Sequence, residues 1–203
     1  MDSYFKQTFI TDVNIDLLKK EVYEIAEKVK REKLKSLSTH TQRRMFGKGS
    51  ITTKLWQHYN LFNFDKPELN NLLIKIKKFF IDTYLPTETY YISAWVNIHK
   101  NGEHLNLHSH WEPEYQTYHG YYAVNAEPSN TTYILPTNKK IYKHENKNFC
   151  LLINKSEGDK HMVSVWHEDS DRITIAFDIV PYSINKQIID SLDCSNQYKL
   201  FIE

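Results

Sequence analysis

Residues 95–110, WVNIHKNGEHLNLHSH, contain the pattern that decides the fold. The segment starts with aromatic and β-branched residues typical of a strand, passes a turn at Gly102 and ends on the pair His108-Ser109-His110. Residues two apart on a strand face the same side, and neutral imidazole is the commonest metal ligand in proteins. The pair therefore predicts two ring nitrogens directed at one metal ion.

A third ligand must come from elsewhere in the chain, and two residues qualify. His161 opens the segment HMVS and could join His108 and His110. Alternatively, Glu112 forms an H-x-E pair with His110, which together with His161 would give the 2-His-1-carboxylate set that holds Fe(II) with open positions. The residue pattern leaves both ligand sets possible.

Arg172 begins a strand that is otherwise largely apolar. Two sets of residues alternate along this strand: Ile173, Ile175 and Phe177, and Thr174, Ala176 and Asp178. A guanidinium at this position would reach into a barrel, where it can bind a carboxylate through two hydrogen bonds. The segment His167-Glu168-Asp169 just before it also has H-x-D spacing, but no histidine follows it and its acidic run is typical of a turn.

Composition excludes several classes of protein. The 203 residues are enough for one domain, and the net charge of +1 gives no general attraction to nucleic acid or acidic membranes. Two cysteines are too few for a disulfide framework, which favours a reducing, cytoplasmic setting. No apolar run approaches the ~20 residues needed to span a bilayer, and the first residues lack the apolar core of a signal peptide. The five glycines form no phosphate-binding loop.

The periodicity predicts two helices followed by a β-rich region. Apolar residues at helical spacing predict helices over residues 15–35, capped by Asp12 or Asn14, and over residues 67–84, with Pro67 near the start. Strands are expected over residues 90–98, 119–125, 131–135, 149–153 and 172–180. We expect one domain with a helical part (1–88), a β core (89–182) of barrel or sandwich type and a C-terminal extension (183–203).

Two clusters of motifs resemble a known family. The first runs Trp95-Val96-Asn97, Gly102, the H-x-H pair, then Gly120-Tyr121-Tyr122; the second runs His161-Met162-Val163, then Arg172-Ile173-Thr174-Ile175-Ala176-Phe177. Over about residues 90–181 this order is similar to a group of Fe(II)- and 2-oxoglutarate-dependent oxygenases often found in phages and marine bacteria. Their pattern is W-x-N, a glycine turn, H-x-H and S-G-x-Y-Y, then H-[ST]-V and R-I-[ST]-I-[SA]-F. At one position of this pattern, His119 replaces the serine.

The resemblance implies a double-stranded β-helix, a jelly-roll, cupin-like core with the helices flanking it. It also implies a dioxygenase, most simply a hydroxylase, that uses O₂. His108, His110 and His161 would hold the iron. Arg172 and Thr174 would bind the distal carboxylate of 2-oxoglutarate, and Asn97 or Tyr122 would contact this cosubstrate.

Two other functions are compatible with the same residues. One is a cupin-like metal dioxygenase that uses no 2-oxoglutarate, and the other is a non-catalytic binding module on the same fold. Arg172 distinguishes the 2-oxoglutarate-dependent oxygenase from the cupin-like dioxygenase, because only the 2-oxoglutarate-dependent enzyme needs a cation for a cosubstrate carboxylate. The sequence does not reveal the primary substrate, and it is compatible with either a monomer or a homodimer.

Overall fold

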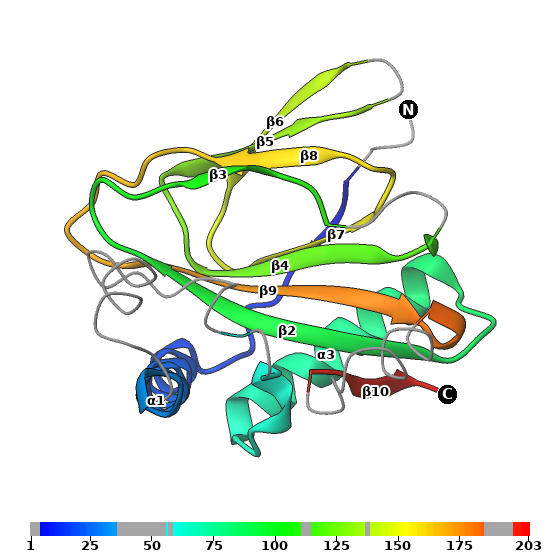
Figure 1. Cartoon of the computed structure of the whole chain (residues 1–203), viewed down its shortest axis with the longest axis horizontal. Helices are drawn as coiled ribbons and strands as arrows, with labels where there is room; N and C mark the ends of the chain where they lie inside the picture. The colour runs from blue at the N-terminus through cyan, green and yellow to red at the C-terminus, as the bar shows by residue number, and fades with distance from the viewer. Residues whose placement is uncertain (1–4, 36–55, 57–58, 111–114, 137–138, 185–196) are drawn as a thin grey trace.

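The computed structural model describes residues 5–35, 56, 59–110, 115–136, 139–184 and 197–203. Two antiparallel sheets are stacked face to face, and the helices cover the outer face of the larger one (Figure 1). The chain passes repeatedly from one sheet to the other between β2 and β9, which is the winding of a jelly roll. The fold is therefore mainly β with a double-stranded β-helix core, as predicted.

The larger sheet has six strands and the smaller sheet has four. In spatial order, the larger sheet contains β1 (Lys6–Phe9), β7 (Cys150–Lys155), β4 (Tyr118–Asn125), β9 (Arg172–Pro181), β2 (Tyr90–His99) and β10 (Lys199–Ile202). The smaller sheet contains β3 (Leu105–His108), β8 (Lys160–Val163), β5 (Ser129–Ile134) and β6 (Ile141–Asn146). Every pair of neighbouring strands is antiparallel.

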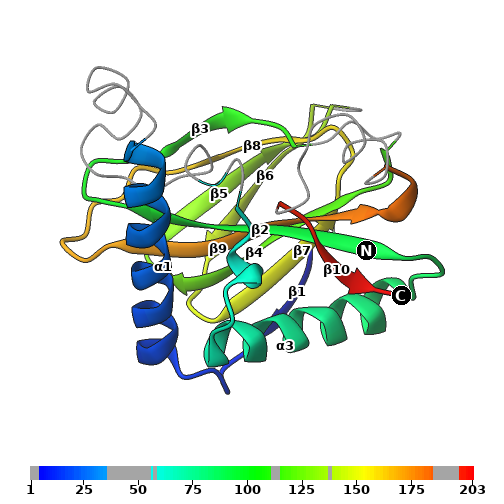
Figure 2. The same cartoon turned by 60° about the horizontal axis from the view of Figure 1, so that its bottom comes forward.

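Helices α1 (Ile15–Lys35) and α3 (Pro67–Tyr84) lie across the larger sheet (Figure 2). The side chain of Asn14 caps α1 by accepting a hydrogen bond from the backbone N–H of Leu17, at 3.1 Å. Pro67 starts α3, and Leu85 ends it in a left-handed conformation. Each helix buries one apolar face, and these faces join the sheet in one hydrophobic cluster.

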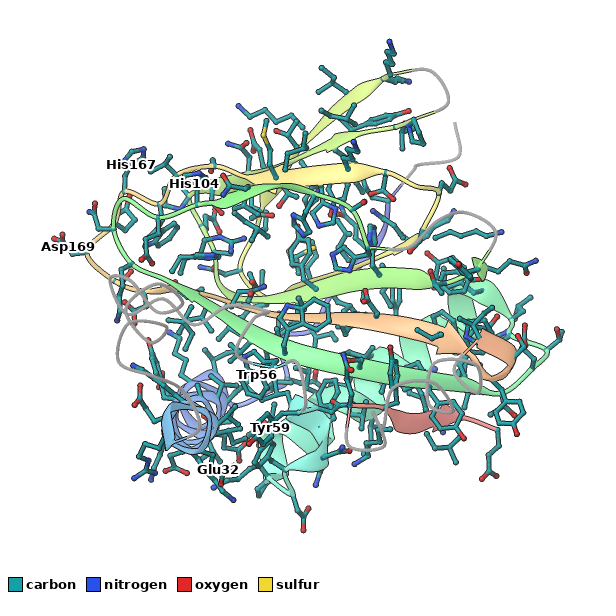
Figure 3. All side chains as sticks on the ribbon, in the orientation of Figure 1. Glu32, Trp56, Tyr59, His104, His167 and Asp169 are labelled. Atoms are coloured by element: carbon teal, nitrogen blue, oxygen red, sulfur yellow. The ribbon has the colours of Figure 1, made fainter. Side chains whose placement is uncertain are left out.

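A short 3-10 helix, η2 (Leu61–Asn63), lies on the helical side of the larger sheet. Nearby, the indole N–H of Trp56 donates to the backbone oxygen of Val96 at 3.1 Å, which ties this region to β2. The hydroxyl of Tyr59 donates to Glu32 of α1 at 3.0 Å. In Figure 3 the labelled side chains of Trp56, Tyr59 and Glu32 all lie between the larger sheet and α1 or beside that helix. These contacts fix the helical layer to the sheet.

Strand β9 separates the two interior layers of the molecule. Its odd-numbered residues Ile173, Ile175, Phe177 and Ile179 belong to the hydrophobic cluster under the helices. Its even-numbered residues Arg172, Thr174 and Ala176 line a cavity between the two sheets. Because side chains alternate along a strand, one strand thus serves both the core and the cavity.

Both predicted helices and all five predicted strands are present, with ends within two residues of those expected. The sequence reading missed β1, β3, β6, β8, β10 and η2. Four of these five strands have only four residues, and β3 (LNLH) and β8 (KHMV) mix polar and apolar residues without a clear period. The last of them, β10, lies within the predicted C-terminal extension and pairs with β2. The polar stretch 36–53, where the sequence predicts a loop and allows a strand, lies outside the described residues.

Neither α1 nor α3 is long and apolar enough to cross a membrane, and the described part of the chain has no other candidate helix.

Candidate metal and cosubstrate site

Three histidines converge in the cavity between the sheets. His108 ends β3 and lies directly opposite His161 of β8 in the antiparallel pair, with the ring centroids 4.3 Å apart. The ring of His110 lies 5.3 Å from that of His108 and 5.0 Å from that of His161. One ligand nitrogen from each ring lies within 4.8 Å of the others, as three ligands of a single ion would. The structure thus brings the three predicted histidines together.

The orientation of the rings indicates which nitrogen is available in each. Nδ1 of His108 lies 2.8 Å from the backbone oxygen of Asn106, and Nδ1 of His110 lies 2.6 Å from Oδ1 of Asp178. Nδ1 of His161 faces Oδ2 of Asp159 at 3.7 Å, which is too long for a hydrogen bond. An oxygen that accepts from Nδ1–H fixes the tautomer with Nε2 unprotonated. His108 and His110 are therefore oriented to offer Nε2 to a metal ion.

The position of His110 differs from the one expected. Strand β3 ends at His108, so the H-x-H pair does not lie on one regular strand. His110 instead stacks on Trp95 of β2, with ring centroids 5.8 Å apart and planes at 21°. Its hydrogen bond to Asp178 of β9 supplies the second anchor. Contacts with the larger sheet, rather than strand alternation, therefore direct His110 toward the other two rings.

Burial and nearby charge set the protonation of these rings. Burial, together with the neighbouring His161, lowers the pKa of His108 to about 4. Burial likewise lowers the pKa of His161, although Asp159 opposes this effect. Burial alone would lower the pKa of His110 too, but the charge of Asp178 and its hydrogen bond outweigh burial and raise it. His108 and His161 are thus held neutral, the form in which imidazole binds metals.

A second group of possible ligands shares one of these residues. His119, Asp159 and His161 are all buried, and their ligand atoms also lie within 4.8 Å of one another. Nε2 of His119 lies 3.5 Å from Oδ2 of Asp159, and neither atom has a hydrogen-bond partner among the described residues. Burial lowers the pKa of His119 to about 3. The sequence pattern left the role of His119 open and gave none to Asp159, although Asp159 forms a D-x-H pair with His161.

Arg172 lies in the same cavity as a buried cation. Only 3% of its surface is exposed, and its guanidinium contacts two hydroxyls, Oγ of Ser129 at 3.1 Å and Oγ1 of Thr174 at 3.5 Å. It makes no ion pair with any carboxylate in the part of the chain that the structure describes. Burial lowers its pKa to about 10, so it stays charged at neutral pH. A buried charge without a counter-ion is costly, so this part of the cavity would favour an anionic ligand.

Two of the other predicted cosubstrate contacts line the cavity. Thr174 lies beside Arg172, two residues along the same face of β9. Asn97 of β2 also lines the cavity, and its Oδ1 is buried without a hydrogen-bond partner among the described residues. Both side chains can therefore serve a polar ligand held between the histidines and Arg172.

The expectation for Tyr122 is corrected by the structure. Its side chain lies on the helical face of β4, in the hydrophobic cluster, and its hydroxyl donates to the backbone oxygen of Ile10 at 2.9 Å. The preceding residue, Tyr121, faces the cavity instead, and so do Tyr133 and Thr131 of β5. The G-Y-Y motif offered two adjacent tyrosines, and alternation along β4 places only the first of them in the cavity.

We expect Tyr122→Phe to lower the free energy of unfolding by about 1–3 kcal/mol, because the buried oxygen of Ile10 loses its donor. The affinity for 2-oxoglutarate should stay unchanged, because the Tyr122 hydroxyl lies outside the cavity. Denaturant unfolding and calorimetric titration of the metal-loaded protein measure the two effects. If Tyr122→Phe instead bound 2-oxoglutarate more weakly and kept its stability, Tyr122 would be a cosubstrate contact after all.

Other candidate ligands lie away from this cluster or outside the described residues. His104 is exposed and its Nε2 contacts Oδ1 of Asn106, while His167 and Asp169 are exposed in the connection from β8 to β9. In Figure 3 the three labelled side chains lie at the edge of the molecule, where these connections turn. The H-x-D spacing of His167 and Asp169 therefore marks a turn, as the sequence reading proposed. Glu112 lies outside the described residues, so the alternative ligand set that contains it stays a prediction.

Comparisons with known proteins support the fold. No protein-family model and no curated protein sequence matches the chain. A prolyl hydroxylase from Trichoplax adhaerens, solved with a hypoxia inducible factor peptide fragment, has a similar structure: TM-score 0.58, 11% identity, covering 92% of this chain and 87% of that one. The α-ketoglutarate-dependent carbocyclase SnoK from nogalamycin biosynthesis matches with a TM-score of 0.55 and 10% identity over 89% and 80% of the two chains.

A prolyl-4-hydroxylase from Pseudomonas putida matches with a TM-score of 0.50 and 11% identity, over 89% of this chain and 88% of that one. The match to a 2OG-Fe(II) oxygenase family protein from Burkholderia pseudomallei spans only 58% of that protein and 56% of this chain, at a TM-score of 0.46. The three matches with TM-scores of 0.50 to 0.58 show that the chain has the jelly-roll fold found in 2-oxoglutarate-dependent oxygenases. At these identities the comparison concerns the fold alone.

Proposed function

We propose that this protein is an Fe(II)- and 2-oxoglutarate-dependent oxygenase, most simply a hydroxylase. The observation that carries the proposal is the pairing of two features in one cavity. Three histidines converge at one end, and a buried arginine without a carboxylate partner among the described residues lies in the same lining. A metal site alone suits many proteins, but a metal site beside an unpaired cation suits a ligand with an anionic tail.

The residues present fit both groups. His108, His110 and His161 would hold Fe(II), and Arg172, with the hydroxyl of Thr174, would hold the distal carboxylate of 2-oxoglutarate. Asn97, which lines the same cavity, would orient this molecule by donating from its side-chain amide N–H to one of its oxygens. Bound Fe(II) with 2-oxoglutarate supplies the reducing equivalents for O₂ activation, with succinate and CO₂ as products. The protein itself binds and orients the cosubstrate and keeps water out of the cavity.

The set His108/His110/His161 is a better site for this chemistry than His119/Asp159/His161. All three members of the first set line the cavity, whereas Asp159 does not. The second set is buried in all its members, at 3%, 2% and 9% exposure. A catalytic metal needs open positions for its ligands, and a fully enclosed one is typical of a structural site. Glu112 remains the alternative to His108.

Two arms of one experiment separate this function from its competitors. The protein is reconstituted anaerobically with Fe(II), exposed to O₂ with 2-oxoglutarate, and assayed for succinate. We expect slow succinate formation that needs both Fe(II) and O₂, even without a primary substrate. O₂ consumption with equal rates with and without 2-oxoglutarate would favour a cupin-like dioxygenase. Absence of bound metal after reconstitution would favour a non-catalytic module.

A further inference from the structure

Among the described acids, Asp178 makes the closest polar contact with the three-histidine cluster. It lies on the cavity side of β9, and its Oδ1 is 2.6 Å from Nδ1 of His110. Both side chains are largely shielded from water, at 12% and 14% exposure. Asp178 occupies the next position after Arg172, Thr174 and Ala176 on the same face of the strand. One strand face therefore carries the carboxylate-binding cation at one end and a buried carboxylate at the other.

The Asp178 carboxylate bears on the net charge of the metal centre. A 2-His-1-carboxylate set lowers the charge of a divalent ion by one, whereas three neutral imidazoles leave it at its full value. A carboxylate hydrogen-bonded to the non-coordinating nitrogen of a ligand histidine makes that ring more basic and more negative. Asp178 is placed to do this for His110, and its charge would act at short range in a shielded site.

We propose that Asp178 supplies, through His110, the negative charge that this three-histidine centre lacks, and so sets the affinity and redox potential of its iron. Asp178 is a positioning residue and does not itself bind the metal. The inference rests on the proposed function only in requiring a metal ion at His108, His110 and His161. Asp159 faces His161 at the greater distance of 3.7 Å and would contribute less.

Among the residues that the structure describes, Asp178 is the main anionic partner of His110. The rings packed against it are those of Trp95, His108, His119 and His161, none of which is an acid. Asp159 also acts on His110, but at longer range than Asp178. Because the contact with Asp178 is direct, replacing that residue should change the metal centre more than replacing any other described acid.

The test compares the wild-type protein, which carries the Asp178 charge, with neutral variants of this residue, all loaded with iron. Asp178→Asn keeps an oxygen that can accept from Nδ1 of His110, so it removes the charge while preserving the ring position. We expect Fe(II) to bind on the order of 10- to 100-fold more weakly. Fe(III) carries more charge, so its affinity should fall more than that of Fe(II). Each tenfold by which the Fe(III) loss exceeds the Fe(II) loss raises the one-electron potential by about 59 mV. Competition with a chelator and anaerobic redox titration measure the two quantities.

Three further variants make the result decisive. Asp178→Ser removes the charge with a smaller side chain and should also raise the redox potential of the iron. Asp159→Asn should raise this potential less. Asp169→Asn, at the exposed turn, should leave it unchanged. Circular dichroism and the unfolding midpoint verify that each variant is folded. A wild-type potential and affinity in a folded Asp178→Asn or Asp178→Ser protein would overturn the inference and leave the proposed function intact. A wild-type protein that binds no Fe(II) would overturn both.

Discussion

We expect His161→Ala to abolish specific Fe(II) binding, with a loss of more than about 100-fold in affinity, which exceeds the usual effect of removing an outer-shell partner. His161 belongs to both groups of candidate ligands, so neither group remains complete without it. The measurement is iron content by mass spectrometry after anaerobic reconstitution and desalting. The exposed His104 provides a matched control, because its ring forms a hydrogen bond with Asn106 and it does not line the cavity.

Three more variants separate the possible ligand sets. His108→Ala should lose the metal, whereas Glu112→Ala and His119→Ala should retain it if His108, His110 and His161 are the ligands. If His108→Ala retains the iron and Glu112→Ala loses it, the carboxylate of Glu112 takes the place of His108 in the ligand set. If His119→Ala loses the iron and His108→Ala retains it, the ion binds at His119, Asp159 and His161 instead. One equivalent of iron in His161→Ala would contradict all of these sites.

The second large effect is expected for Arg172→Leu, which should weaken 2-oxoglutarate binding while leaving the metal in place. Removing one partner of a desolvated charge pair costs about 2–5 kcal/mol, or about 30- to several-thousand-fold in affinity. Arg172→Lys should recover part of this loss, because lysine keeps the charge but lacks the planar guanidinium that binds a carboxylate through two hydrogen bonds. Calorimetric titration of the metal-loaded proteins measures all three affinities.

A ligand without the distal carboxylate provides the control for Arg172. The five-carbon acid 2-oxopentanoate keeps the 2-oxo acid end of 2-oxoglutarate but ends in a methyl group. Wild-type protein should prefer 2-oxoglutarate strongly, and this preference should nearly disappear in Arg172→Leu. An equal preference in the wild type and the variant would remove Arg172 from cosubstrate binding, whatever the absolute affinities.

The long elements and the candidate ligands could be predicted because their signals are local. Helical spacing defined α1 and α3, and alternation defined β9 together with the side of it that carries Arg172 and Thr174. The same alternation placed Asp178 on that side, but only the fold reveals that His110 lies against it. Contacts between residues far apart in the chain, such as Asp159 with His119, leave no spacing pattern in a single sequence, whereas the D-x-H spacing of Asp159 and His161 is visible there.

The tyrosine pair on β4 marks another limit of pattern reading. Tyr121 and Tyr122 are chemically equivalent neighbours, so a motif that contains both cannot decide which of them contacts a ligand. The pairing of β4 with β7 and β9 decides it, by directing Tyr122 to the core and Tyr121 to the cavity. The short strands β3 and β8 likewise owe their existence to pairing, which sets His108 opposite His161.

The most direct test of the proposed function is whether 2-oxoglutarate binding depends on the metal. The chain is titrated anaerobically with 2-oxoglutarate in a metal-free form and after loading with Fe(II), or with Mn(II) as a redox-stable surrogate. The arrangement of His108, His110, His161 and Arg172 predicts one equivalent of 2-oxoglutarate per chain in the loaded protein and much weaker binding without metal. Equal binding with and without metal, or no binding to a protein that holds one equivalent of metal, would contradict it.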